Sequence, residues 1–215
     1  ALEANPDRTD DENQILARWY LAKGRLEDAC ALFDQVEGVL GRADIACLIA
    51  QHTADLSRRR PWVVKMVAYG GPSFHGGLKR FDEITRGMTR DQRLAVAEEG
   101  VLANPTLDRA GRSFRLICER YGPGSDPLCT VAESVASLAR VRASVERVLQ
   151  AVPADSPTAR EVQLAMDNVE ASARVIQQRR EGLGRCVVLI GGKPLSYGTH
   201  AIIIPDRPTE QEHYA

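Results

Sequence analysis

Apolar residues recur every three or four positions along most of the chain, which is the spacing of one helix face. A capping box of Thr9 and Glu12 precedes the first such run, and Gly24 ends it. A second helix follows over 26–36, and the glycines at 38 and 41 mark the next turn. The pattern therefore predicts consecutive short helices from residue 9 onward, joined by turns that contain glycine.

The same spacing predicts helices as far as residue 183. The third carries Ile45 and Ile49 and is expected to end near the basic run 58–60, while the apolar segment 61–68 suits a short helix or a strand. Later helices are predicted over 78–85, 89–102, 105–118, 127–152 and 157–183. The last two are joined by a short turn that contains proline, which predicts an antiparallel helical hairpin resembling a short coiled coil, with two ordinary bundle helices as the alternative.

Beyond the helices the composition changes. The segments 186–190 and 201–204 are rich in β-branched residues and predict two short strands around a loop, which form a β-hairpin. The expected fold is mainly α, an irregular bundle of antiparallel helical hairpins with a small C-terminal β-hairpin. We place a first domain at 1–122 and a second at 123–215, and a single domain is the alternative.

Composition restricts the class of protein. Hydrophobic residues make up 44% of the chain, enough to build a core, and the formal net charge of −1 argues against a dedicated nucleic-acid binder. No apolar run approaches the roughly 18–20 residues that span a bilayer, so no transmembrane segment is expected. The chain begins at Ala1 without a methionine, which fits either a mature form after removal of a targeting segment or a trimmed chain.

The cysteines are placed around predicted turns. Cys30 and Cys47 lie at nearly equal distances from the turn that contains the glycines at 38 and 41, so an antiparallel helical hairpin would bring them face to face. A disulfide needs a Cα separation of about 4.4–6.8 Å, which such a hairpin offers. Cys118 and Cys129 flank the next strong turn signal in the same way. We predict both bridges, and buried free thiols are the alternative.

Two disulfides imply an oxidising location. Such bridges persist in exported and periplasmic proteins and are rare in the cytosol. The predicted location is therefore periplasmic or otherwise exported, with the mitochondrial intermembrane space or, for reduced cysteines, the cytoplasm as alternatives.

Small and aromatic residues recur at fixed intervals in the first two predicted helices. Gly24 is at the turn, Ala29 follows five residues later, and Phe33 four residues after that. In these positions residues 16–36 resemble a tetratricopeptide unit, although Arg58 stands at the glycine position of the next period of about 34 residues. The resemblance implies one helix-turn-helix of that type and a role in protein binding.

A glycine-rich loop, 70–77, follows the apolar segment 61–68. Ser73 and His75 lie in this loop, and serine with histidine can carry out acyl transfer. The spacing is that of neither a P-loop nor a G-x-S-x-G elbow, so a contact loop or a flexible connector is favoured. The residues expected to contact a partner are Gly71, Pro72, Ser73, Phe74 and His75.

A second candidate pair lies in the predicted β-hairpin. Cys186 and His200 stand at the outer ends of the two strands, and cysteine with histidine is a nucleophile pair, although strand pairing alone would bring them together. No cysteine pair has the spacing of a structural zinc site, and His52 and His213 have no obvious ligand partners. We therefore expect neither a metal nor a cofactor.

The leading hypothesis is a non-enzymatic scaffold, assembly factor or accessory subunit that binds another protein or a complex in an oxidising compartment. The predicted C-terminal hairpin offers an edge that a partner's sheet can extend. The first alternative is a hydrolase or transferase that uses Ser73 with His75 or Cys186 with His200. The second is an inhibitor or immunity-type protein that blocks a partner's cleft with the loop 70–77. The sequence does not determine the oligomeric state.

Overall fold

The computed structural model describes residues 2–5, 7–122, 131–183, 189–190 and 193–194. This part of the chain is mainly helical, as the sequence predicts. Its elements are η1 (Leu2–Ala4), α1 (Asp10–Ala22), α2 (Leu26–Phe33), α3 (Val39–His52), α4 (Leu56–Ala68), η2 (Gly71–Ser73), α5 (Gly77–Ile84), α6 (Arg90–Ala103), α7 (Asp108–Tyr121), α8 (Val131–Ala151), α9 (Pro157–Leu183), β1 (Leu189–Ile190) and β2 (Lys193–Pro194).

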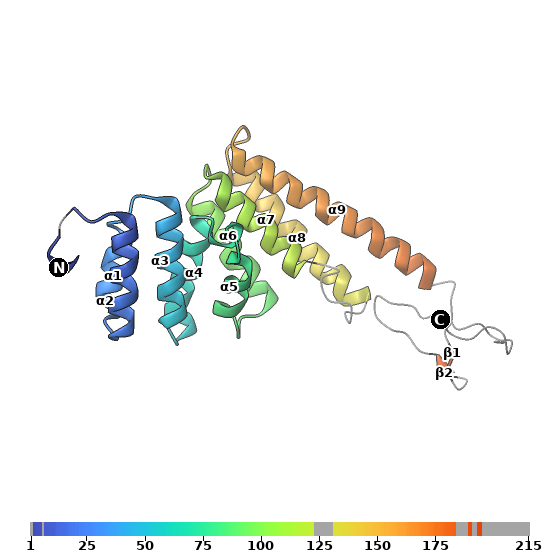
Figure 1. Ribbon diagram of the computed structural model, residues 1–215. Coiled ribbons are helices and arrows are strands. Elements are labelled where there is room, and N and C mark those ends of the chain that lie inside the picture. Colours follow the sequence, from blue (N-terminus) through green and yellow to red (C-terminus); the bar gives the residue numbers. More distant parts are fainter. Residues whose placement is uncertain (1, 6, 123–130, 184–188, 191–192, 195–215) are drawn as a thin grey trace, which may run out of the picture.

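Helices that follow one another in the chain pack in pairs, and the pairs stack along the molecule (Figure 1). Helix α1 packs on α2, α3 on α4, α6 on α7 and α8 on α9. Successive pairs are joined by the contacts of α1 with α3, α4 with α6, α6 with α8 and α7 with α9. Helix α1 therefore lies at one end of the stack, and the long α8–α9 hairpin lies at the other.

Local signals determine where several helices begin and end. Thr9 Oγ1 accepts a hydrogen bond from Glu12 N, and the Glu12 carboxylate accepts one from Thr9 N, so the predicted capping box at α1 is confirmed. A second box, of Thr89 and Gln92, begins α6. Gly24 follows α1 with φ +71°, a left-handed conformation that disfavours other residues.

The predicted end of the third helix is wrong. Helix α3 ends at His52, and the basic run 58–60 lies in the first turns of α4. Asp55 caps α4 by accepting a hydrogen bond of 2.8 Å from Arg58 N. The Arg59 side chain donates to the carbonyl of Thr53 (2.6 Å) and to those of residues 54 and 84, so it satisfies the C-terminal ends of α3 and α5.

The C-terminal β-hairpin is not supported as predicted. Residues 201–204, its second strand, lie outside the described residues. The pair that the structure does contain is only two residues long on each side and joins the end of the predicted first strand to residues 193–194, with Leu189 opposite Pro194 and Ile190 opposite Lys193.

The buried apolar side chains form one continuous cluster. It runs from Leu16 on α1 to Val169 on α9 and includes the fully buried Phe81 and Phe114. The core thus crosses the boundary that the sequence analysis places at residue 122. None of the helices in the described ranges has the length and the apolar composition needed to cross a bilayer.

Candidate functional site

The loop with Ser73 and His75 folds back onto α7. The Ser73 hydroxyl donates a hydrogen bond of 2.7 Å to the carbonyl oxygen of Gly70, and Ser73 N donates one of 3.2 Å to Ser113 Oγ on α7. His75 is exposed on the outer side of the loop. The hydroxyl of Ser73 is thus engaged by its own loop, whereas a serine nucleophile needs a base within hydrogen-bond reach.

The same packing covers much of the predicted contact surface. Gly71 and Pro72 are buried, and Phe74 lies beneath the Arg109 guanidinium, 4.4 Å from the ring centroid. Of the five predicted contact residues only His75 is fully exposed. Little of this loop therefore remains to enter a partner's cleft.

The thiols of Cys30 and Cys47 have different charged neighbours. Cys30 lies near Lys65 of α4, whereas Cys47 lies near Arg80 of α5. Both thiols are free, so the predicted bridge between them is not formed in this structure. Cys118 is free as well, and Cys129, its predicted partner, lies outside the described residues.

Burial makes the described thiols weak nucleophiles. It raises the pKa of Cys30, raises that of Cys47 to about 11 and raises that of the fully enclosed Cys118 further still. The other candidate pair, Cys186 with His200, lies outside the described residues. Among the residues that the structure describes, no three side chains of the metal-binding types come together.

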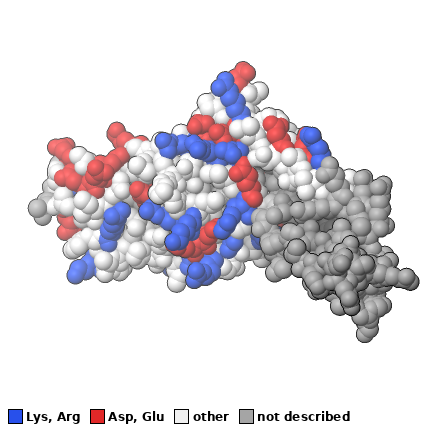
Figure 2. Space-filling model, turned by 45° about the vertical axis from the view of Figure 1, so that its right-hand side comes forward, with Lys and Arg blue, Asp and Glu red and all other residues white. Residues whose placement is uncertain are grey.

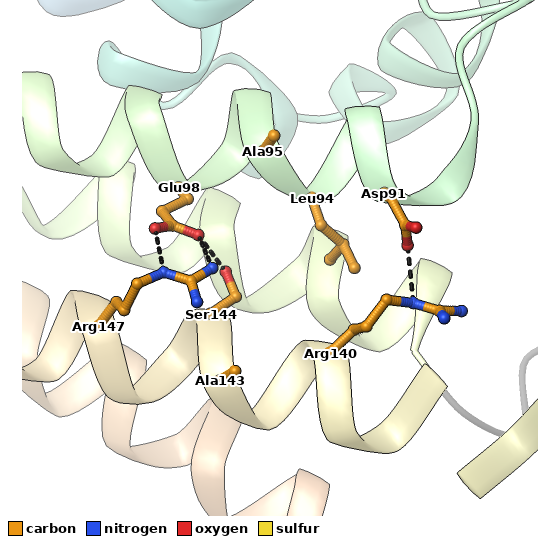
Figure 3. Close-up of a pocket in the computed structure, with 8 residues that line it drawn as sticks. All are labelled: Asp91, Leu94, Ala95, Glu98, Arg140, Ala143, Ser144 and Arg147. Carbon is orange, nitrogen blue, oxygen red and sulfur yellow. Dashed lines mark hydrogen bonds and ion pairs between the residues drawn. The ribbon is translucent and has the colours of Figure 1, made fainter. Parts of the chain in front are cut away.

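A shallow groove of about 280 Å³ lies between α6 and α8 (Figure 3). Arg147 Nε and Nη2 donate to the two carboxylate oxygens of Glu98 over 2.7 and 2.8 Å, and Ser144 Oγ donates to the same carboxylate over 2.8 Å. One end of the groove is closed by Arg140 Nε, which lies 2.8 Å from Asp91 Oδ1. Leu94, Ala95 and Ala143 line the remainder.

The charged side chains of the groove form ion pairs with one another. Arg147 holds the pKa of Glu98 below its usual value, so the carboxylate is ionised at neutral pH. Asp91 and Glu98, the two acidic side chains that line the groove, each pair with an arginine of α8, which leaves no excess charge of one sign to attract a charged substrate. We interpret these pairs as the polar contact that holds α8 against α6.

A second hollow, of about 360 Å³, lies between η1 and α1 at the end of the stack. It is lined by the apolar residues Leu2, Ile15, Leu16 and Trp19 and by the acidic Glu3. Ile15 is 57% exposed and Trp19 44% exposed, and because they lie four residues apart on α1 they share one side of the helix. Neighbouring residues of the same helix, Leu16 and Tyr20, point inward and are buried.

Arg8 holds the wall of this hollow in place. Its guanidinium donates to the carbonyl oxygens of Leu2 (3.1 Å) and Asn5 (2.6 Å), and its Nε donates to Oδ1 of the buried Asn13 (2.8 Å). Within η1, Glu3 forms an ion pair of 2.9 Å with Arg25. The segment is therefore fixed along α1 without covering it.

The exposed residues of α1 form one face. They are Asp11, Ile15, Arg18, Trp19 and Ala22, which recur at helical spacing and are all exposed, and we call this set the α1 face. The sequence pattern identifies the helix but not this face, because the apolar Ile15 and Trp19 follow the same helical spacing as the buried Leu16 and Tyr20. The sequence signal that distinguishes Ile15 and Trp19 from the buried residues is that their side of the helix also carries charged or small residues, namely Asp11, Arg18 and Ala22.

Charge is unevenly distributed along the molecule. Residues 1–37 contain nine acidic and four basic residues, a net charge of −5, so the rest of the chain carries a net charge of +4. Figure 2 shows acidic side chains gathered over the N-terminal end and Lys and Arg prominent further along. In the described part of the chain, Asp11, Arg18 and Lys23 form no ion pair with another side chain.

Comparison with known proteins adds no assignment: no family model matches the chain, and neither does any curated protein or solved structure. The helical hairpin of α1 and α2 occupies the place of the tetratricopeptide resemblance, with Ala29 and Phe33 buried, but membership of that family stays a prediction.

Proposed function

We propose that this chain is a non-enzymatic interaction protein, a scaffold or accessory subunit, that binds a protein partner through the α1 face. The observation that carries the proposal is the exposure of Ile15 and Trp19 at the uncovered end of a helical stack. Stacks of helical hairpins bury each pair against its neighbours, so a terminal pair normally presents a polar outer side. An apolar side chain left exposed there is typical of a binding surface.

The chemistry of the α1 face suits a protein rather than a small molecule. The hollow beside it is open and mostly apolar, with a single carboxylate, Glu3, that is already paired with Arg25. Tryptophan is among the residues most enriched at the energetic centre of protein interfaces. The Trp19 indole packs against the ring of Tyr20, with the two ring centroids 5.4 Å apart.

The proposal is tested by affinity capture from cells of the source organism with the full chain as bait. We expect a specific partner to be retained by the wild type and lost with the double variant Ile15→Ser and Trp19→Ser. The matched control is Leu102→Ser, which removes an apolar side chain that is 37% exposed on α6 and should retain the partner.

Two results test the interaction role and the binding surface separately. A partner that the double variant still retains would preserve the interaction role and place it on another surface. If no protein is enriched over an unrelated helical bait of the same size, the proposed function is wrong.

A further inference from the structure

The N-terminal end of the stack carries acidic charge that the chain does not neutralise. Residues 1–37 contain nine acidic side chains, and within the described residues only two of them form ion pairs, Glu3 and Asp28, which share Arg25. The net charge of this segment is −5, from nine acidic and four basic residues. Such an end repels a second copy of itself and attracts a basic partner.

Two of the carboxylates without an ion pair lie close to the apolar hollow. Asp11 and Glu12 belong to the first turn of α1 and precede Ile15 by four and three residues, so they lie one helical turn away from it. Glu3 is part of the lining of the hollow. A basic side chain of a partner that lies at the N-terminal end of α1 therefore meets carboxylates whose charge is not neutralised.

The basic side chains around α1 lie elsewhere. Arg18 does not line the hollow, because it is turned by about 100° from Trp19 around the helix. Lys23 follows the last residue of α1, and Arg25 is already paired with two carboxylates. The basic part of a partner therefore fits at the N-terminal half of α1 and not at its C-terminal end.

The uncovered apolar surface is small. Helix α1 has 13 residues and is therefore about 20 Å long, so its exposed side offers less than the roughly 800 Å² that each partner contributes to a standard protein interface. The hollow of about 360 Å³ has room for a large apolar side chain. This surface suits a short segment that inserts an anchor residue, as in the binding of an amphipathic helix to a groove.

We propose that the α1 face and the hollow beside it bind a short basic segment of another protein, in which a large apolar residue is flanked by lysine or arginine. The apolar residue enters the hollow between Leu2 and Trp19, and the basic side chains lie near Asp11 and Glu12. Apolar burial supplies most of the affinity, and the charges select the segment. The proposal rests on the proposed function, because it names the class of partner at the same surface.

Selection from a library of random peptides, with the full chain as bait, tests the proposal. Peptides of about 12 residues are used, because as helices they are about 18 Å long and match α1. We expect the enriched peptides to carry a large apolar residue next to several lysines or arginines. Synthetic copies should bind the double variant Ile15→Ser and Trp19→Ser at least about tenfold more weakly than the wild type, as the loss of a central anchor implies. The control Leu102→Ser should bind them as the wild type does.

Charge variants separate the local attraction from the net charge. Asp11→Asn with Glu12→Gln removes two carboxylates near the hollow and keeps the capping box, which glutamine also forms. The matched control, Glu146→Gln with Glu170→Gln, removes two exposed carboxylates from α8 and α9 and changes the net charge equally. The first variant should bind the selected peptides about threefold more weakly or worse, and the control should bind them as the wild type does. Circular dichroism should show both variants as helical as the wild type.

Three results overturn the proposal. The first is a selection that enriches no peptide whose binding depends on Ile15 and Trp19. The second is the enrichment of acidic or uncharged peptides at this surface. The third is a variant without the carboxylates of Asp11 and Glu12 that binds the selected peptides as tightly as the wild type. In each case the proposed function still stands if affinity capture retains a partner through the α1 face, because that experiment uses no peptide.

Discussion

At the residue scale, Cys30 and Cys47 are predicted to form a disulfide and are free thiols in the structure. Both lie on helices that flank one turn, as their sequence positions suggest. Residues on a helix also differ by 100° in direction for each step, however, so equal distance from a turn does not place two side chains on facing sides. The charged neighbour of Cys30 is Lys65 on α4, whereas that of Cys47 is Arg80 on α5.

The free thiols predict an order of reactivity. In a variant with Cys129→Ser and Cys186→Ser, a thiol reagent should label Cys30 before Cys47 and Cys118 in the folded protein at pH 8. With a pKa of about 11, roughly one Cys47 thiol in a thousand is ionised at that pH, and the thiolate is the reacting form. The rate for Cys47 should rise up to about pH 11, where the thiol becomes ionised.

Mass spectrometry of the labelled peptides measures the order, and unfolding in urea is the control, in which all three thiols should react alike. Equal rates in the folded protein would contradict the assigned burial. A bridge between Cys30 and Cys47 in material purified without reductant would restore the argument for an oxidising compartment.

At the element scale, the contact between α6 and α8 depends on ionised Glu98. Replacing Glu98 by Gln should lower the free energy of unfolding at pH 7 by about 1 kcal/mol, because the charge-assisted bonds from Arg147 and Ser144 are weakened and Arg147 is partly exposed. The pKa of Glu98 is lowered in the folded state, so its contribution is present above about pH 4.3 and is lost as the pH falls through the lowered value.

Urea unfolding followed by circular dichroism at pH 7 and pH 3 tests this dependence. The difference between wild type and variant should be smaller at pH 3 than at pH 7. Glu99→Gln is the matched control on the same helix, since Glu99 and Arg60 form a more exposed ion pair that should contribute less. An equal loss at both pH values would show that the carboxylate charge is not the cause.

The crossing of α4 and α6 depends on Gly100. A Cβ atom added there would lie 2.5 Å from Val67 Cβ, which forces the two helices apart. Gly100→Ala should therefore destabilise the protein by about 1–3 kcal/mol, although alanine is the better helix former. Thermal unfolding measures the loss, and Leu102→Ala on the exposed side of α6 should change the midpoint little; a variant as stable as wild type would contradict the close packing.

At the scale of the whole molecule, the continuous core predicts one cooperative transition. Both tryptophans lie in the N-terminal half, on α1 and α4, whereas far-ultraviolet circular dichroism reports on all helices. Because the core continues from Leu16 to Val169, urea curves from the two probes should coincide. If the circular dichroism signal begins to fall at a lower urea concentration than the tryptophan fluorescence changes, the α8–α9 hairpin unfolds by itself. The division at residue 122 would then describe two domains.

The sequence by itself determined the features that depend on neighbours within four residues. The capping boxes at Thr9 and Thr89, the turn at Gly24 and the extent of α9 were predictable, because caps and helix periodicity act over one turn. Asp55, the N-cap of α4, is also a local signal. The sequence analysis missed it because it continued the third helix to the basic run 58–60.

Only the tertiary structure decided which side of each helix became the outside. The packing of the Ser73 loop onto α7, the separation of the two thiols and the exposure of Ile15 and Trp19 all depend on contacts between distant segments. An apolar stripe predicts that a helix has a face to bury, but whether a neighbour covers every part of that face depends on where the stack ends.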